Sequence, residues 1–316
     1  MEQATERAPV VSEPIDALPS SFVSSKMQSE DFAQFMSFMD AYLRAVEDVR
    51  EDRLIHDFFA EPLTCQVAAQ LSPRLHKWKQ KHPHPENYVA LRGRYLDDAL
   101  LQRDPSIRQI VLLGAGLDTR AFRLQSLVGC HVFEIDQSAE LFKHKQTVLE
   151  KLEPTLLADR HDYVVADLNA FNWEEGLLYN GFKPELPTFW VLEGITMYLT
   201  QASNIALLKT IDVLSAPGSK VWGDTAGCGI MHEGGLFLFK VVSELYQKEL
   251  GKQLFQHTED NVCEGIFNEL PWEIELQADL GEPGIHFGRE WDPVLTQITQ
   301  VPVVFQFVLV TKGLAT

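Results

Sequence analysis

The stretch QIVLLGAGLDTRAFRL, residues 109–124, decides the fold of this 316-residue chain. It opens with an apolar run typical of a buried strand, passes straight into Gly114-Ala115-Gly116, and continues as a helical pattern. Glycines at such a turn let the backbone approach a ligand closely, and the helix N-terminus offers unpaired N–H groups. The turn therefore predicts a nucleotide-like ligand, with an ordinary tight strand-to-helix turn as the alternative.

Strand-like and helical segments alternate outward from this turn in the βαβ manner. The strands expected after 109–113 are 131–136, 163–166, 189–192, 220–223, 272–277 and 303–312. A chain that alternates in this way builds a mainly parallel sheet with crossover helices on its faces. The predicted fold class is a Rossmann-like, doubly wound α/β fold.

Composition and helical pattern also predict the domain organisation. Residues 1–27 carry three prolines and scattered serines and are expected to form a disordered tail, followed by a single domain over 28–316. Within that domain, helical sequence at 28–101 predicts an N-terminal cap. The polar segment 77–85 contains two prolines and predicts a loop. Residues 226–270 form a long, partly helical insertion, well placed to cover a substrate as a lid.

The charge of the chain restricts its partners. Its formal net charge is −18, from 45 acidic and 27 basic residues. Such a surface repels phosphate backbones and anionic lipids, so no nucleic acid and no membrane is expected as a partner. The four cysteines, Cys65, Cys130, Cys228 and Cys263, form no C-x-x-C pair and are expected to be reduced thiols of a cytoplasmic protein.

Acidic residues recur where the predicted strands end. Asp136 stands about 20 residues beyond Gly116, where a carboxylate can accept both hydroxyl protons of an adenosine ribose. Glu134, two residues earlier on the same side of the strand, is the fallback. Asp167 and Glu193 follow the next two strands, and the carboxyl ends of parallel strands line a single crevice. Three acids along one rim favour a ligand with several hydrogen-bond donors.

Arg92 is expected to point inward. On a helix over 88–101, at about 100° per residue, Arg92 falls within the apolar face, while Arg94 falls nearly opposite and four residues before Asp98. A buried arginine needs an anion. That anion is either the carboxylate of a bound amino acid or one of the rim acids in an internal salt bridge.

Catalytic and metal-binding residues are harder to find in the sequence. Tyr198 and Glu193 are the candidates for a catalytic role, and no general base with an evident partner is found. His82 and His84 alternate with prolines but have no third ligand nearby, so no metal site is predicted.

Six stretches together resemble one family. They are LRAVEDVREDRLIHDFFAEPL, ALRGRYLDDALL, VLLGAGLDTRAFRL, FEIDQ, VADL and VLEGITMYLT, which run in order from about Leu43 to Thr200. They are similar to the leucine carboxyl methyltransferase-like group of class I S-adenosylmethionine-dependent methyltransferases. The turn Asp118-Thr119-Arg120 resembles the bacterial O-methyltransferase branch of that group more than the phosphatase methyltransferases.

The resemblance implies a seven-stranded sheet whose last strand is antiparallel, with helices ahead of the sheet that close over S-adenosyl-L-methionine. It assigns cofactor binding to Arg92, Gly114, Gly116, Asp136, Asp167, Leu168 and Glu193. In this assignment Arg92 holds the methionyl carboxylate, Asp136 the ribose, and Asp167 with Leu168 the adenine. Glu193 lies near the amino-acid portion and the methyl donor.

The function expected from these observations is transfer of a methyl group to a carboxylate or hydroxyl of a small molecule. Three alternatives stay open: a methyltransferase acting on a protein C-terminal carboxyl group, an NAD(P)-dependent oxidoreductase, and a non-catalytic cofactor-binding module. The oxidoreductase also needs a glycine turn and an acid about 20 residues later. However, the third glycine of the dinucleotide fingerprint is missing here.

Overall fold

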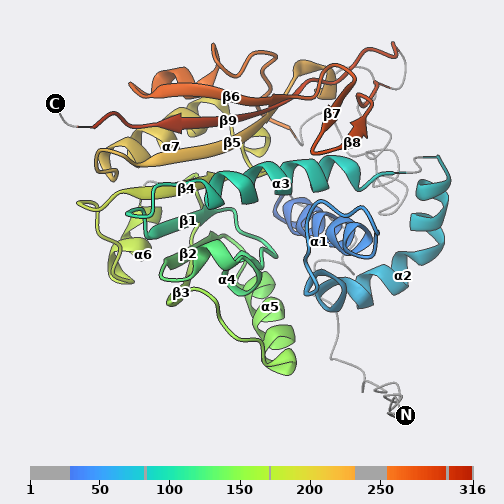
Figure 1. Cartoon of the computed structure of the whole chain (residues 1–316), viewed down its shortest axis with the longest axis horizontal. Coiled ribbons are helices and arrows are strands. Elements are labelled where there is room, and N and C mark those ends of the chain that lie inside the picture. Colours follow the sequence, from blue (N-terminus) through green and yellow to red (C-terminus); the bar gives the residue numbers. More distant parts are fainter. Residues whose placement is uncertain (1–28, 82–83, 171, 232–254, 297–298, 315–316) are drawn as a thin grey trace.

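The computed structural model describes residues 29–81, 84–170, 172–231, 255–296 and 299–314. The tail predicted at 1–27 lies outside the described residues, as does the part of the predicted lid at 232–254. The described residues form a sheet with helices on both faces, and further helices beside it (Figure 1).

The sheet has seven strands in the order β3-β2-β1-β4-β5-β9-β6. Their bounds are β1 Gln109–Leu113, β2 His131–Asp136, β3 Arg160–Val165, β4 Thr188–Leu192, β5 Lys220–Ala226, β6 Glu273–Asp279 and β9 Phe305–Thr311. Strands β1 to β5 pair in parallel, and β9 pairs antiparallel with both β5 and β6. The predicted doubly wound sheet with an antiparallel last strand is therefore confirmed. A hairpin of β7 Gly284–His286 and β8 Arg289–Trp291 was not predicted.

The burial of each strand agrees with its place in the sheet. All five residues of β1 and all five of β4 are buried, as expected for continuous apolar runs in the middle of a sheet covered on both faces. The edge strand β3 is more polar, and only Val164 in it is fully buried. The strand order changes direction at β1 and β4, where a ligand crevice is expected at the carboxyl ends.

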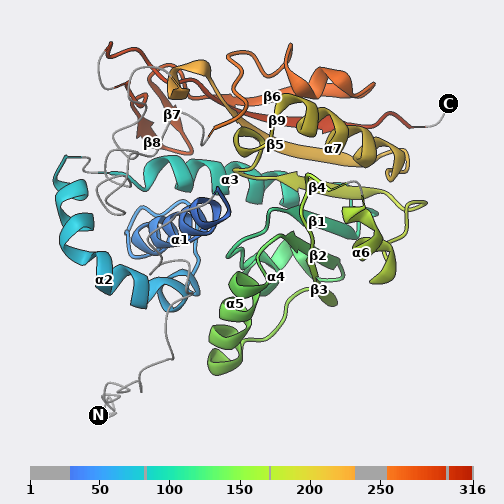
Figure 2. The same ribbon diagram turned by 180° about the vertical axis from the view of Figure 1, so that it is seen from behind.

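Helices cover both faces of the sheet. Helix α3, Asn87–Leu101, packs on one face, and α6, Trp173–Tyr179, and α7, Gln201–Val213, pack on the other (Figures 1 and 2). Two helix starts have side-chain caps: Ser138 accepts from the Leu141 N–H ahead of α5, Ala139–Leu152, and Thr200 accepts from the Ser203 N–H ahead of α7. None of the described helices is both long and apolar enough to span a membrane.

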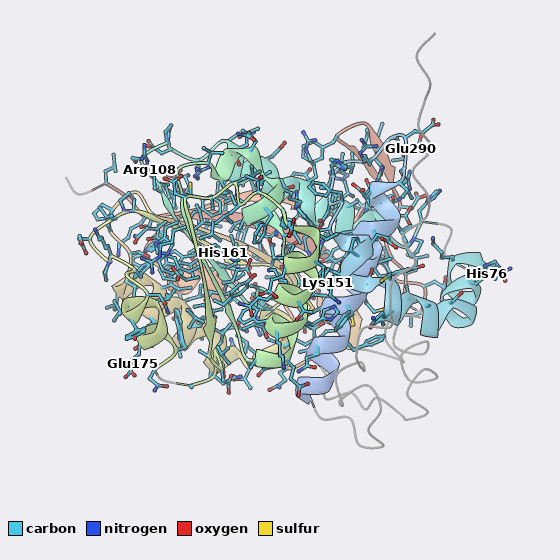
Figure 3. The ribbon with its side chains drawn as sticks, turned by 90° about the horizontal axis from the view of Figure 1, so that it is seen from below. His76, Arg108, Lys151, His161, Glu175 and Glu290 are labelled. Carbon is cyan, nitrogen blue, oxygen red and sulfur yellow. The ribbon has the colours of Figure 1, made fainter. Side chains whose placement is uncertain are left out.

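The N-terminal helices α1, Ser29–Asp48, and α2, Ala60–Lys81, lie beside the sheet, with α1 between α2 and α3 in both views (Figures 1 and 2). Figure 3 shows α1 next to α5, the helix that carries Lys151, and the rings of Phe38 and His144 lie 5.1 Å apart there. The loop predicted over 77–85 is wrong in its first part. Helix α2 continues to Lys81 because residues 77–81 contain no proline or glycine to stop it.

Candidate functional site

A cavity of about 1180 Å³ brings the predicted cofactor-binding residues together. They come from helix α3 and from the carboxyl ends of four parallel strands, which is where ligands bind in open α/β sheets. The described residues that line the cavity include Arg92, Gly114, Gly116, Asp136, Asp167, Leu168, Glu193 and Tyr198. The volume exceeds the roughly 300–1,000 Å³ typical of a pocket for one ligand. The cavity is therefore larger than one ligand of that class requires.

The glycine turn after β1 has a backbone that other residues rarely adopt. Gly114 has a φ of 65° and Gly116 a φ of 51°, both in the left-handed region. A Cβ at Gly114 would clash with the Cγ2 of Ile195, and one at Gly116 would lie 2.8 Å from the Oγ of Ser37. Close packing and backbone conformation thus both require glycine at these two positions.

Asp136, at the end of β2, is tied to the glycine turn. Its Oδ2 accepts from the Gly116 N–H at 2.9 Å, and its Oδ1 accepts from the Ser138 N–H at 2.9 Å. Burial raises the pKa of this carboxyl, although the two N–H donors oppose the rise. Each carboxylate oxygen can accept a further hydrogen bond, so Asp136 can still bind hydroxyl donors in the cavity.

Glu134, the fallback for Asp136, is not among the described residues that line the cavity. It is completely buried, with the Lys145 Nζ at 2.5 Å and the His161 Nε2 at 3.0 Å. The expectation that it could replace Asp136 is therefore wrong. Glu134 lies within the strand under α5, whereas Asp136 lies where the chain leaves the sheet.

Asp167 and Leu168 lie just after β3 and are more open. The Oδ1 of Asp167 accepts from the N–H of Asn169 at 2.9 Å and from its side-chain amide at 3.1 Å. The side chain of Asp167 is exposed, and that of Leu168 is half-buried. Together they offer the cavity one carboxylate and one apolar surface.

Arg92 points inward and Arg94 outward, as the helical pattern predicts. The side chain of Arg92 is 6% exposed, whereas that of Arg94 is 39% exposed and pairs with Asp98 at 3.1 Å. The Nη2 of Arg92 donates to Asp40 at 2.7 Å, and its Nε donates to Glu193 at 3.1 Å. Burial alone would lower the pKa of Arg92, but these carboxylates hold it well above its ordinary value. The internal salt bridge to a rim acid is therefore present, with Asp40 of α1 as an unforeseen second partner.

Glu193 lies between two arginines. Besides Arg92, the Nη1 of Arg120 donates to Glu193 at 2.7 Å, and Arg120 also pairs with Asp97 and Asp118. Burial would raise the pKa of Glu193, but Arg120 and Arg92 hold it well below the usual range. A carboxylate in this state accepts a proton poorly, which disfavours Glu193 as a general base.

Asp224 is a fourth acid near the carboxyl end of a strand, and sequence reasoning missed it. It lies in β5 and is completely buried. Its Oδ1 accepts from the Gly194 N–H at 2.5 Å, and its Oδ2 accepts from the Tyr88 hydroxyl at 3.1 Å. Burial raises the pKa of Asp224 to about 6. The rule that identified Asp136, Asp167 and Glu193 would also have found it.

The cavity has two halves. We call the part formed by Arg92, Gly114, Gly116, Asp136, Asp167, Leu168 and Glu193 the sheet-edge half. The apolar half is the part lined by Tyr88, Met197, Tyr198, Ile230, Phe255, Val294, Leu295 and Phe305. Rings pack together in the apolar half: Tyr88 and Phe305 have centroids 4.4 Å apart, and Tyr198 and Phe255 have centroids 5.4 Å apart. The apolar half suits a molecule with an apolar or aromatic body.

Within the part of the chain that the structure describes, no group of three or more His, Cys, Asp or Glu side chains could hold a metal ion. His82 lies outside the described residues. The Nδ1 of His84 lies 3.3 Å from a carboxylate oxygen of Glu86.

Known proteins resemble this chain. A family model described as leucine carboxyl methyltransferase matches residues 37–212. A protein of Streptomyces coelicolor is 42% identical over 189 residues, which cover 57% of this chain and 61% of that relative. A protein of Mycobacteroides abscessus is 33% identical over 253 residues, which cover 77% of this chain and 79% of that relative. Both carry the name "Putative S-adenosyl-L-methionine-dependent methyltransferase".

The match to the Streptomyces coelicolor protein thus spans only 61% of that protein's length. Among solved structures, this chain is similar to the crystal structure of a protein from Thermobifida fusca. Its sequence is 16% identical to this chain, and the two structures superpose with a TM-score of 0.49. That comparison covers 86% of this chain and 94% of the other.

Proposed function

The chain belongs to the leucine carboxyl methyltransferase family, and we propose that it is an S-adenosyl-L-methionine-dependent O-methyltransferase acting on a carboxylate or hydroxyl of a small molecule. The observation that carries this proposal is the shared cavity, because all seven residues assigned to the cofactor line it. A glycine turn, several rim acids and a buried arginine together match an adenosyl amino acid better than a dinucleotide.

The residues of the sheet-edge half fit the parts of this cofactor. Asp136 would accept from the ribose hydroxyls, and Asp167 with Leu168 would receive the adenine. Arg92 would hold the methionyl carboxylate, which would compete with Asp40 for the guanidinium. Glu193, fixed between Arg92 and Arg120, would lie near the amino-acid portion. Gly114 and Gly116 would let the backbone lie against the cofactor.

We also propose that residues 28–101 form a cap over the cofactor and that residues 226–270 form a lid over the acceptor. Supporting the cap, Ser37 of α1 lies against Gly116, and Gln34 of α1 donates to the Ser138 Oγ at 2.7 Å. Supporting the lid, Ile230 and Phe255, one from each described part of it (226–231 and 255–270), line the apolar half.

When bound, S-adenosyl-L-methionine supplies a methyl group on a positively charged sulfur. The chain's own contribution would be to align the acceptor oxygen with that methyl group and to exclude water. A small molecule is the acceptor we favour, because the cavity is larger than one ligand requires and one half of it is apolar.

A crystal structure of the protein grown with S-adenosylhomocysteine tests this proposal. We expect the ribose at Asp136, the adenine at Asp167 and Leu168, and the sulfur facing the apolar half. A ligand bound outside this cavity, or one whose ribose does not contact Asp136, would contradict the assignment.

A further inference from the structure

The hydroxyl of Tyr88 connects the cavity to Asp224. Tyr88 lines the cavity, and its hydroxyl donates to the Oδ2 of Asp224 at 3.1 Å. Asp224 is 0% exposed and is not among the described residues that line the cavity. A molecule in the cavity can therefore touch Tyr88, and Tyr88 can exchange a proton with a carboxylate that the molecule does not touch.

The charge around the cavity disfavours an anionic acceptor. Its described lining residues include seven Asp or Glu, two arginines and no lysine. Both arginines already pair with carboxylates: Arg44 with Asp57 at 2.8 Å, and Arg92 with Asp40 at 2.7 Å. A carboxylate acceptor would meet these acids with no lining arginine left for it, because Arg44 pairs with Asp57 and Arg92 is assigned to the cofactor. A neutral hydroxyl meets no such penalty.

We propose that the methyl acceptor is the hydroxyl of a neutral, apolar ring compound, and that Tyr88 takes its proton while passing its own proton to Asp224. This inference rests on the proposed function and narrows it. Tyr88 is then the catalytic residue that touches the acceptor, and Asp224 orients Tyr88 and receives the proton. An already ionised carboxylate acceptor would need no such relay.

The step balances in atoms and charge. The acceptor oxygen bonds to the methyl carbon as the carbon–sulfur bond breaks, and the electron pair of that bond stays on sulfur. The products are a methyl ether and S-adenosylhomocysteine. The acceptor proton moves to the Tyr88 oxygen, the Tyr88 proton moves to the Oδ2 of Asp224, and Asp224 later releases it to water.

Other acids near the cavity suit this role less well. Glu193 is held ionised by its two arginines, which keep its pKa well below the usual range. Glu290 and Asp292 line the cavity but are exposed, whereas the Tyr88 hydroxyl contacts the buried Asp224. Asp224 is buried and has a pKa raised to about 6, which suits a proton acceptor at neutral pH.

The groups that face Asp224 come from helix α3 and from the turn after β4. Burial is the main cause of its raised pKa, Arg92 of α3 and the Gly194 N–H oppose the rise, Glu193 adds to it, and the Tyr88 hydroxyl opposes it. Tyr198, in the turn after β4, also lies within its electrostatic reach. Below pH 6 Asp224 becomes protonated and can no longer receive the Tyr88 proton. Transfer to a hydroxyl should therefore slow about tenfold per pH unit below about 6.

Binding of two matched probes tests the acceptor class. The protein is first saturated with S-adenosylhomocysteine, and calorimetry records this binding. The saturated protein is then titrated at pH 7.5 with 2-naphthol and, separately, with 2-naphthoate. We expect 2-naphthol to bind at least about 10-fold more tightly, because only the anion meets the acidic lining. Equal or tighter binding of 2-naphthoate overturns the inference, as does binding of neither probe. Failure of S-adenosylhomocysteine itself to bind would instead contradict the proposed function.

Matched tyrosine variants test the contact with Tyr88. Tyr88→Phe should weaken 2-naphthol binding about 10-fold and leave 2-naphthoate binding unchanged, because it removes one hydrogen-bonding hydroxyl. Tyr95→Phe is the control: Tyr95 lies on the same helix and also loses a hydrogen bond, to the Nδ1 of His286 at 2.8 Å, outside the cavity lining. If the two variants weaken 2-naphthol binding equally, the acceptor does not contact the Tyr88 hydroxyl.

A pH profile tests the relay. Single-turnover transfer from S-adenosyl-L-methionine to bound 2-naphthol should rise with pH and level off above about 6 in the unmodified protein. Asp224→Asn should remove this rise and slow transfer at pH 8 by at least about 100-fold. No transfer to bound 2-naphthol at pH 8, or an unchanged profile in Asp224→Asn, would overturn the relay.

Discussion

The two halves of the cavity differ in how their side chains are held. In the sheet-edge half, Arg92 and Glu193 are fixed by ion pairs and Asp136 by two backbone N–H groups. In the apolar half, aromatic rings pack on each other, as those of Tyr198 and Phe255 do at 5.4 Å. Directional contacts define one ligand closely, whereas apolar packing accepts a class of molecules. The difference suggests that the sheet-edge half sets the cofactor and the apolar half sets the acceptor.

Replacing Arg120 by Met should have the largest effect, on stability. The change removes the arginine that pairs with Asp118. It also removes one of the two buried arginines that pair with Asp97 and with Glu193, so the free energy of unfolding should fall by about 3–5 kcal/mol. Denaturant titration measures it. The control is Arg160→Met, because Arg160 is 55% exposed in its pair with Asp162 and should matter by less than about 1 kcal/mol. Equal losses of unfolding free energy in the two variants would show that the buried ion pairs of Arg120 stabilise the fold no more than an exposed pair.

Asp136→Ala should weaken S-adenosylhomocysteine binding by about 3 kcal/mol, roughly 100-fold or more, through loss of two charged hydrogen bonds. Calorimetry on the folded variant measures the change. Asp167→Ala provides a comparison, because Asp167 is exposed and should contribute less. Unchanged affinity in Asp136→Ala would remove Asp136 from the site.

Arg92→Met should weaken the same ligand by about 2 kcal/mol, because a carboxylate loses its charged partner. The matched change is Arg94→Met, on the outward face of the same helix, where an i,i+4 pair with Asp98 is worth about 0.5 kcal/mol or less. If the two variants bind S-adenosylhomocysteine equally well, the buried arginine has no role in holding it.

Leu295→Ala should have the smallest effect and should separate the two halves. Leu295 lines the apolar half, so 2-naphthol affinity should fall by about 1 kcal/mol while S-adenosylhomocysteine affinity stays within about twofold. Leu276→Ala is the control, since Leu276 is 44% exposed, close to the 43% of Leu295, but lies on β6 and does not line the cavity. If Leu295→Ala lowers the affinity for S-adenosylhomocysteine more than the affinity for 2-naphthol, the two halves do not bind separate ligands.

What could be predicted from the sequence follows the same division. The glycine turn and the acids of the sheet-edge half lie at strand ends, where local pattern and topology fix their place. Arg92 could be placed inward from helical periodicity alone. The same rule reaches Asp224, because it directly follows the expected strand 220–223 as Glu193 follows 189–192, but the sequence prediction names acids only through the fourth strand.

The rest depends on contacts between distant segments. Asp40 of α1 reaches Arg92, 52 residues away, and Arg120 reaches Glu193 across 73 residues. No local pattern encodes these pairs, since they arise only when α1 and α4, Arg120–Arg123, pack near the sheet edge. The apolar half likewise combines α3, the turn after β4, the described lid residues and β9.

The sheet-edge half is proposed to bind an adenosyl amino acid. Titration calorimetry of the purified protein with S-adenosylhomocysteine, and separately with NADH and NADPH, tests it most directly. We expect saturable binding of S-adenosylhomocysteine at one site per chain and no heat of binding from either dinucleotide. Saturable binding of a nicotinamide dinucleotide, with no response to S-adenosylhomocysteine, would contradict it.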